Sequence, residues 1–198
     1  MHSTGIWILS LSILVGAVSM GMAEDDQDLP SNVDPLTGTL QVPSNYSEWP
    51  TMGTWTHTKV VDGEPVIHEY HVVYTQPETI TYYRQHNRFP DGAVLVKELL
   101  NAETMAMTTG PAVGHATTIK GWFVLVRDTQ GRFKESPLWG DGWAWSLFNA
   151  DNPRKTVSKN YQNDCVGCHL PAKNLAPPQA VEADKWIYSF GYPMLRSK

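Results

Sequence analysis

The alternation of apolar and polar positions along the chain predicts a domain built mainly of β-strands. Stretches rich in β-branched and aromatic residues, bounded by Gly, Pro, Asp or Asn, are typical of strands. Five such stretches occur, at residues 55–61, 65–74, 93–100, 121–128 and 142–149. Asp62-Gly63 between the first two predicts a tight hairpin turn. A further strand is expected within residues 185–195.

Short helices are expected between and after these strands. Residues 77–86 begin with a proline, which the first turn of a helix tolerates, and Ser44 is expected to cap a short helix within residues 43–49. Residues 150–163 are polar and are expected to be partly helical. The prediction is therefore an α+β fold, a mainly antiparallel β-sheet of about five strands with short helices.

The first residues predict an export signal. Residues 6–18 are apolar apart from Ser and Gly, and Gly21-Met22-Ala23 offers the small residues of a cleavage site. We expect residues 1–23 to be a signal peptide, residues 24–41 a loose N-terminal arm and residues 42–198 one domain. The signal lacks Lys and Arg, so an uncleaved anchor is the alternative, although the apolar run is short for a span. After cleavage no membrane attachment is expected.

Composition excludes several classes of protein. The chain has 198 residues, of which 41% are hydrophobic, enough for a packed core rather than a disordered chain. Its net charge of −5 argues against a nucleic-acid-binding protein, and its two cysteines argue against a disulfide scaffold.

Both cysteines fall in one motif, Cys165-Val-Gly-Cys168-His169. This is the C-x-x-C-H pattern of c-type haem attachment. Two thiols at this spacing can form thioethers to the two vinyl groups of one haem, and the adjacent histidine then lies beneath the iron as its axial ligand. We therefore predict one haem c per chain, packed on one side of the sheet.

Two other kinds of site use a C-x-x-C pair. A redox-active pair needs no histidine directly after it. A zinc site needs two further ligands, and the chain holds no second cysteine pair. Both alternatives are therefore less favoured than haem c.

The sixth coordination position of the iron has no obvious partner in the sequence. The motif lies near the C-terminus, and Met194 is the only later methionine. Other residues left open as ligands are Met105, Met107, His57, His68, His71, His86 and His115. His68 and His71 are expected on opposite faces of one strand. The pattern favours a five-coordinate iron, which leaves a site for small molecules.

Lys97 and Glu98 interrupt the apolar strand at residues 93–100. Alternation places Lys97 with Ala93 and Leu95 on one face, so each face carries one charged side chain. Lys97 can extend its amine to solvent or pair with Glu98. The alternative is a buried lysine whose amine pKa is lowered and which acts as a nucleophile towards the porphyrin edge.

Four motifs carry a resemblance to a known family. They are Pro43-x-Asn45-Tyr46-x-x-Trp49, Phe89-x-Asp91-Gly92 followed by Val96-Lys97-Glu98-Leu99, Cys165-x-x-Cys168-His169, and Tyr192-Pro193-x-Leu195-Arg196. Over about residues 40–196 the chain resembles cytochrome P-460 and its relative cytochrome c′-beta.

The resemblance implies a periplasmic homodimer with a mainly antiparallel sheet. It implies that Cys165 and Cys168 attach the haem, that His169 ligates the iron, and that Lys97 is covalently joined to a porphyrin meso carbon. Such enzymes oxidise hydroxylamine, and a carboxylate near the iron would assist as a base. The sequence leaves four carboxylates open for that role, namely Glu98, Glu135, Asp141 and Asp151.

Three functions follow as hypotheses. The first is a hydroxylamine-oxidising haem enzyme that passes electrons to a soluble cytochrome c. The second is a non-enzymatic nitric oxide-binding protein of the cytochrome c′-beta kind, with an apolar pocket to which Trp143 or Trp145 contributes. The third is a simple electron carrier with Met194 as sixth ligand.

Overall fold

The computed structural model describes residues 29–196, so the predicted signal peptide lies outside the described residues. The strands are β1 (Thr51–Val61), β2 (Glu64–Thr75), β3 (Val94–Met107), β4 (Gly110–Arg127), β5 (Trp139–Gly140) and β6 (Trp143–Asn149). The α-helices are α1 (Pro77–His86), α2 (Tyr161–Asp164) and α3 (Val166–Leu175). Four short 3₁₀ turns complete the described chain: η1 (Tyr46–Glu48), η2 (Glu182–Trp186), η3 (Ser189–Gly191) and η4 (Pro193–Leu195).

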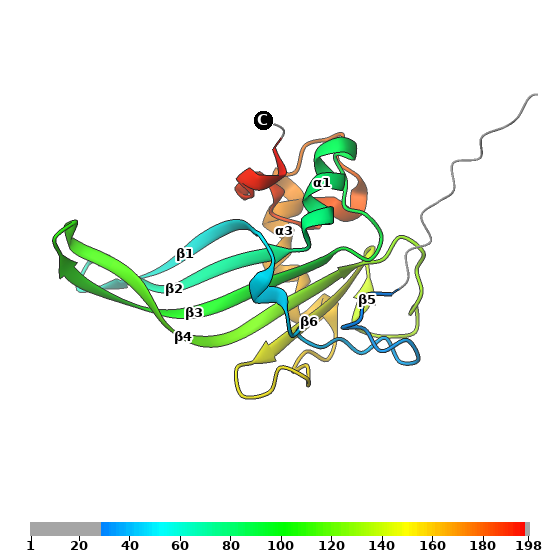
Figure 1. Cartoon of the computed structure of the whole chain (residues 1–198), viewed down its shortest axis with the longest axis horizontal. Helices are drawn as coiled ribbons and strands as arrows, with labels where there is room; N and C mark the ends of the chain where they lie inside the picture. The colour runs from blue at the N-terminus through cyan, green and yellow to red at the C-terminus, as the bar shows by residue number, and fades with distance from the viewer. Residues whose placement is uncertain (1–28, 197–198) are drawn as a thin grey trace, which may run out of the picture.

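The strands form one antiparallel sheet of six in the order β1-β2-β3-β4-β6-β5. This confirms the α+β prediction. β1 to β4 continue beyond the rest of the sheet as a curved arm of two hairpins, while α1, α3 and the C-terminal turns cover one face at the other end (Figure 1). The sheet thus has one end that is packed on both faces and one that projects from the body.

Two apolar clusters lie on the two faces of the packed end. Val73, Leu95 and Leu125 belong to the cluster that includes Trp186 and the C-terminal turns. The strand neighbours that point the other way join a second cluster with residues of the N-terminal segment: Val94, Val96, Val124 and Val126. Strand alternation therefore decides which side chains reach the helical face.

The N-terminal segment is packed from residue 29 onward, contrary to the expected loose arm. Val33 and Leu40 form an isolated β-bridge and are both buried in the second cluster. Leu40 is completely shielded from solvent. The turn-rich composition of the segment did not indicate that these two apolar side chains pack against the face of the sheet that carries the second cluster.

The C-terminal segment is also different from its prediction, because residues 185–195 form 3₁₀ turns and no strand. Gly191 lies so close to β1 that a Cβ atom there would be 2.0 Å from the Trp55 ring. Two of the aromatic residues that suggested a strand, Trp186 and Tyr192, are instead buried, each only 6% exposed, whereas Phe190 is exposed.

Smaller differences concern caps and strand ends. Ser44 does not cap a helix, because Asn45 precedes the turn at η1 and no side chain caps it. Of residues 150–163, only the start of α2 is helical. The long hairpin of β3 and β4 extends well past the predicted strand ends, whereas the predicted Asp62-Gly63 turn is confirmed, with positive φ at both residues.

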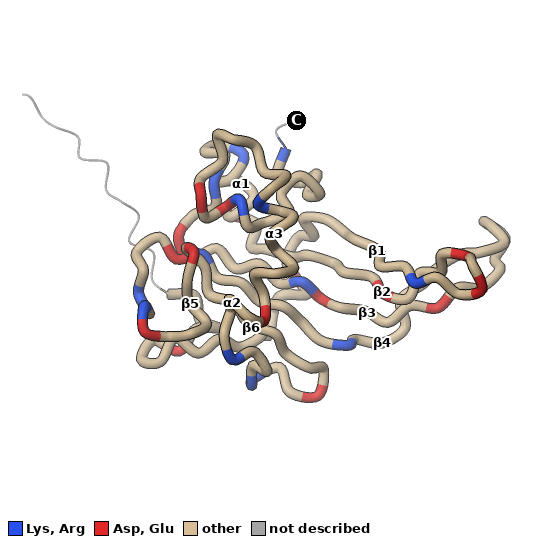
Figure 2. The backbone as a smooth tube through the Cα atoms, turned by 180° about the vertical axis from the view of Figure 1, so that it is seen from behind, with Lys and Arg blue, Asp and Glu red and all other residues tan. Residues whose placement is uncertain are grey.

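Charges of both signs are spread over the arm and the body, without gathering on one element (Figure 2). Among the described helices, none is long and apolar enough to cross a membrane.

Asp91 organises the turn that leads into β3. Its Oδ1 accepts hydrogen bonds from the backbone N–H and the hydroxyl of Thr129, at 2.7 and 2.8 Å, and its other oxygen pairs with Arg132. Gly92 follows with a φ of 70°, which glycine adopts without strain. The turn therefore fixes the start of the strand that carries Lys97.

We expect Asp91→Ala to lower the free energy of unfolding by about 2 kcal/mol, because Thr129 loses its acceptor and Arg132 loses this carboxylate while it keeps Asp128. Burial raises the pKa of Asp91, but hydrogen bonds from Arg132 and Thr129 outweigh it and lower that pKa. The carboxylate therefore stabilises the fold above its unfolded pKa of about 4, and this contribution is lost as the pH falls through the lower folded value. Urea denaturation between pH 7 and pH 3 measures both effects. The exposed control Asp151→Asn should match the wild type, and an equal acid sensitivity of Asp91→Ala and wild type would contradict this role.

Candidate functional site

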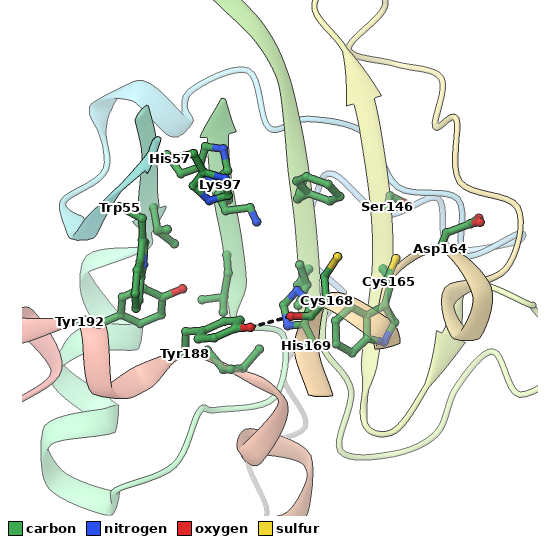
Figure 3. A pocket seen from close by; sticks show the side chains of 17 residues that line it. Trp55, His57, Lys97, Ser146, Asp164, Cys165, Cys168, His169, Tyr188 and Tyr192 are labelled. Carbon is green, nitrogen blue, oxygen red and sulfur yellow. Dashed lines mark hydrogen bonds between the residues drawn. The ribbon is translucent and has the colours of Figure 1, made fainter. Parts of the chain in front are cut away.

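A cavity of about 400 Å³ lies between the helical face of the sheet, α3 and the C-terminal turns. Strands β1, β2, β3, β4 and β6 each contribute side chains to its wall, and most of the lining is apolar. Its volume lies in the range of cofactor and ligand sites. Figure 3 shows the two cysteines, His169 and Lys97 around this one space.

The cysteines stand at the start of α3. Cys165 is the residue before the helix and is buried, and Cys168 is exposed one turn later. The N–H of Cys168 donates to the Cys165 carbonyl at 3.1 Å, which closes this first turn. Both sulfurs face the cavity (Figure 3). The cysteines are not joined in a disulfide.

Polar side chains fix the chain just before the motif. The Asp164 carboxylate accepts hydrogen bonds from the backbone N–H groups of Lys159 and Asn160, at 2.7 and 3.0 Å. The Asn160 side chain in turn accepts from Gln162 and Asn163 and caps α2. These bonds set the direction in which the chain enters the cysteine motif.

His169 is oriented by the C-terminal segment. Its Nδ1 lies 2.7 Å from the carbonyl oxygen of Trp186, so Nδ1–H donates there and Nε2 keeps its lone pair. The ring meets Trp145 edge to face, with centroids 4.9 Å apart. Burial lowers the pKa of His169 to about 4, which leaves the imidazole neutral at pH 7. A neutral ring with one nitrogen bonded to a carbonyl is the usual state of a metal-ligating histidine.

These observations fit haem c. The two sulfurs and His169 line one cavity, as thioether attachment and axial ligation require. A zinc site fits poorly, since within residues 29–196 the cysteines join no cluster of three or more metal-ligating side chains. Cys165, Cys168 and His169 would therefore hold the haem, which supplies an iron centre able to bind small molecules and to exchange electrons.

A family model for Cytochrome P460 matches residues 43–187. The chain belongs to the cytochrome P460 family. It is accordingly a haem c cytochrome of that family, as its motifs led us to expect. A comparison with curated proteins finds no match.

In this cytochrome P460 family member, Lys97 projects into the cavity from the first part of β3. It shares the helical face with Leu95, and its amine lies 4.4 Å from the centroid of the Phe123 ring. No carboxylate of the described residues lies within 4 Å of that amine. Burial lowers the pKa of Lys97. The structure thus favours the buried-amine interpretation over an extended surface lysine.

Glu98 points to the other face, where it is 8% exposed. It accepts hydrogen bonds from the hydroxyls of Tyr46 and Tyr74, and the Trp122 indole donates to Tyr46 at 2.9 Å. Two of the family motifs, those containing Tyr46 and Glu98, therefore meet behind the sheet. This network holds β3 from the side opposite the cavity.

None of the carboxylates named as bases lines the cavity. Glu98 is on the far face, and the other three are exposed outside the cavity: Glu135, Asp141 and Asp151. Strand alternation alone places Glu98 on the face opposite Lys97. It could not exclude the other three, because they lie in turns whose position relative to the cavity no local pattern specifies.

The residues that line the cavity also show which of the candidate iron ligands lie at the site. Met194 is 40% exposed and does not line the cavity. Among the histidines of residues 29–196 outside the haem motif, only His57 and His71 line it. Trp145 does so as well, whereas Trp143 is fully buried in the core. No local pattern predicts that His57 of β1 converges with Glu69 and His71 of β2.

Proposed function

We propose that this protein is a periplasmic hydroxylamine oxidoreductase in which Lys97 is covalently joined to its single haem c. The observation that carries the proposal is the buried Lys97 amine, which pairs with no carboxylate of residues 29–196 and faces the same cavity as Cys165 and Cys168. A buried, unpaired ammonium is costly, so the neutral amine is favoured. Its lone pair makes it a nucleophile.

The proposed bond joins Lys97 Nζ to a meso carbon. It replaces one hydrogen on the amine and one on the porphyrin, so two electrons and two protons must leave. A peroxide is the class of oxidant that would accept them and become water. The flanking Phe123 ring restricts the amine to the cavity. A porphyrin that is held rigidly by this bond and has altered electronics would change the reactivity of the iron.

The other cavity residues have supporting tasks. His169, oriented by the Trp186 carbonyl, would hold the haem iron, and the apolar wall, including Val73 and Leu95, would keep water out of the cavity. Two hydroxylamine molecules give one nitrous oxide, one water, four protons and four electrons. A soluble cytochrome c would accept the electrons.

The test combines peptide mapping with turnover. After proteolysis of the purified holo protein, the Lys97 peptide should be recovered joined through haem to the peptide of residues 165–169. Anaerobic hydroxylamine with an electron-accepting dye should yield reduced dye and nitrous oxide. A free Lys97 peptide together with no dye reduction would refute the proposal.

The second candidate function is nitric oxide binding without turnover. It is favoured by the mostly apolar wall and by the exclusion of all four proposed carboxylate bases from the cavity. It predicts a free Lys97 peptide and a ferrous protein that binds nitric oxide. The electron-carrier hypothesis loses its support, because Met194 lies outside the cavity wall.

We also propose that the protein is a homodimer joined through the arm. Large apolar side chains are exposed along the arm: Val60, Val61, Met105, Met107 and Ile119. A second copy is a partner that would cover them. Light scattering after gel filtration should give the dimer mass for the wild type and the monomer mass for Val60→Asp with Met105→Asp. Leu36→Asp, which changes an exposed residue outside the arm, should remain dimeric.

A further inference from the structure

We propose that His57, Glu69 and His71 bind one divalent transition-metal ion, Zn²⁺ or Cu²⁺, at the edge of the haem cavity. The three side chains bring one ligand atom each, and these atoms all lie within 4.8 Å of one another. The cluster is separate from the cysteine motif, and its metal would be distinct from the haem iron.

Strand pairing creates the cluster. Glu69 and His71 are two residues apart on β2 and therefore lie on one face, and His57 is the β1 residue paired with Glu69. A register shift lies directly after His57, between His57 and Thr58. Such irregularities redirect side chains locally and are common near functional sites. Rigid strands thus hold all three donors.

The distances suit a shared ion. His71 Nε2 and Glu69 Oε2 are 3.0 Å apart. Two ligands that each lie about 2.0–2.2 Å from one Zn²⁺ are separated by roughly 3.0–3.5 Å. An ion can therefore take the place of the proton between these two atoms with little movement. The His57 ring lies beside the His71 ring, with centroids 4.0 Å apart, and supplies the third donor.

A neighbouring lysine holds the carboxylate donor in place. Lys120 pairs with Glu69 Oε1, which leaves Oε2 for the ion. Lys120 would not bind the ion itself but would orient the carboxylate that does.

The donor set selects the metal. Two imidazoles and one carboxylate are typical ligands of Zn²⁺ and Cu²⁺, whereas Ca²⁺ and Mg²⁺ prefer sites made wholly of oxygen. Three protein ligands also leave a coordination position for water or for a small ligand. His57 and His71 both line the cavity that contains Lys97, so this position borders the cavity that would hold the haem.

Metal binding can be tested on the untagged holo protein, independently of hydroxylamine turnover. After chelator treatment, which does not remove thioether-bound haem, Zn²⁺ is titrated by calorimetry and the bound metal is counted by mass spectrometry. We expect one Zn²⁺ per chain, and Cu²⁺ should compete for it. His57→Ala, at an exposed position, and Glu69→Gln should each weaken binding by at least about tenfold.

His86→Ala provides the matched control, because His86 is a histidine of α1 that lies outside the cavity. It should bind Zn²⁺ like the wild type, and unchanged circular dichroism and haem spectra should show that every variant is folded. The proposal is overturned if the wild type binds no Zn²⁺, or if His57→Ala and Glu69→Gln bind as tightly as it does. A protein that takes up Zn²⁺ but leaves hydroxylamine unoxidised would refute only the proposed function.

Discussion

Lys97→Met is expected to return the ferrous Soret band to that of ordinary haem c and to lower hydroxylamine turnover by about 10- to 100-fold, a range typical of changes to groups that position a metal centre. The wild type should show a red-shifted band, because a bond to the meso carbon alters the porphyrin. Methionine has nearly the length of lysine and remains apolar, so it fills the space beside Phe123 without the amine. Optical spectra of the reduced proteins and steady-state rates measure the two effects.

The matched control is Lys59→Met, at an exposed position of β1. It should leave the spectrum and the rate unchanged. An unchanged Soret band in Lys97→Met would contradict the cross-link directly.

The second large effect concerns the cysteines. Replacing Cys165 and Cys168 together with alanine is expected to abolish covalent haem attachment. Each thiol adds its S–H across one vinyl double bond, so attachment needs no oxidant and no leaving group, only the two sulfurs at the correct spacing. Haem staining after denaturing electrophoresis, with intact mass measurement, should show one haem on the wild type and none on the double variant.

Ser146→Ala is the control for this experiment. It changes another polar residue of the cavity wall, and it should stain like the wild type. Each single cysteine variant should keep one thioether and one free vinyl group, which shifts the pyridine haemochrome band. A double variant that stains as strongly as the wild type would contradict the assignment of the motif.

Local features of the site could be predicted from the sequence. The haem motif occupies five consecutive residues, so its spacing alone brings both sulfurs and His169 to one helix turn. The face of Lys97 followed from strand alternation, which holds because β3 is regular between Leu95 and Leu99. The hairpin at Asp62-Gly63 likewise depends only on neighbouring residues.

Features that depend on strand register or on tertiary packing could not be predicted. The convergence of His57 with Glu69 requires the pairing of β1 and β2, which no local pattern specifies. Strand alternation already places Glu98 on the face opposite Lys97, but its hydrogen bond with Tyr46, a residue 52 positions away, depends on tertiary packing. The C-terminal segment has the composition of a strand, but its rings are buried against other elements and it makes no ladder.

The bond between His169 and Trp186 makes the order of synthesis significant. The iron ligand is oriented by a carbonyl that follows it by 17 residues, and Tyr188 and Tyr192 close the wall still later in the chain. In a chain that emerges from its N-terminus, both thiols are therefore exposed before the residues that close the pocket are present. Haem delivered at that stage would meet an accessible motif, which packing of the last turns would then enclose.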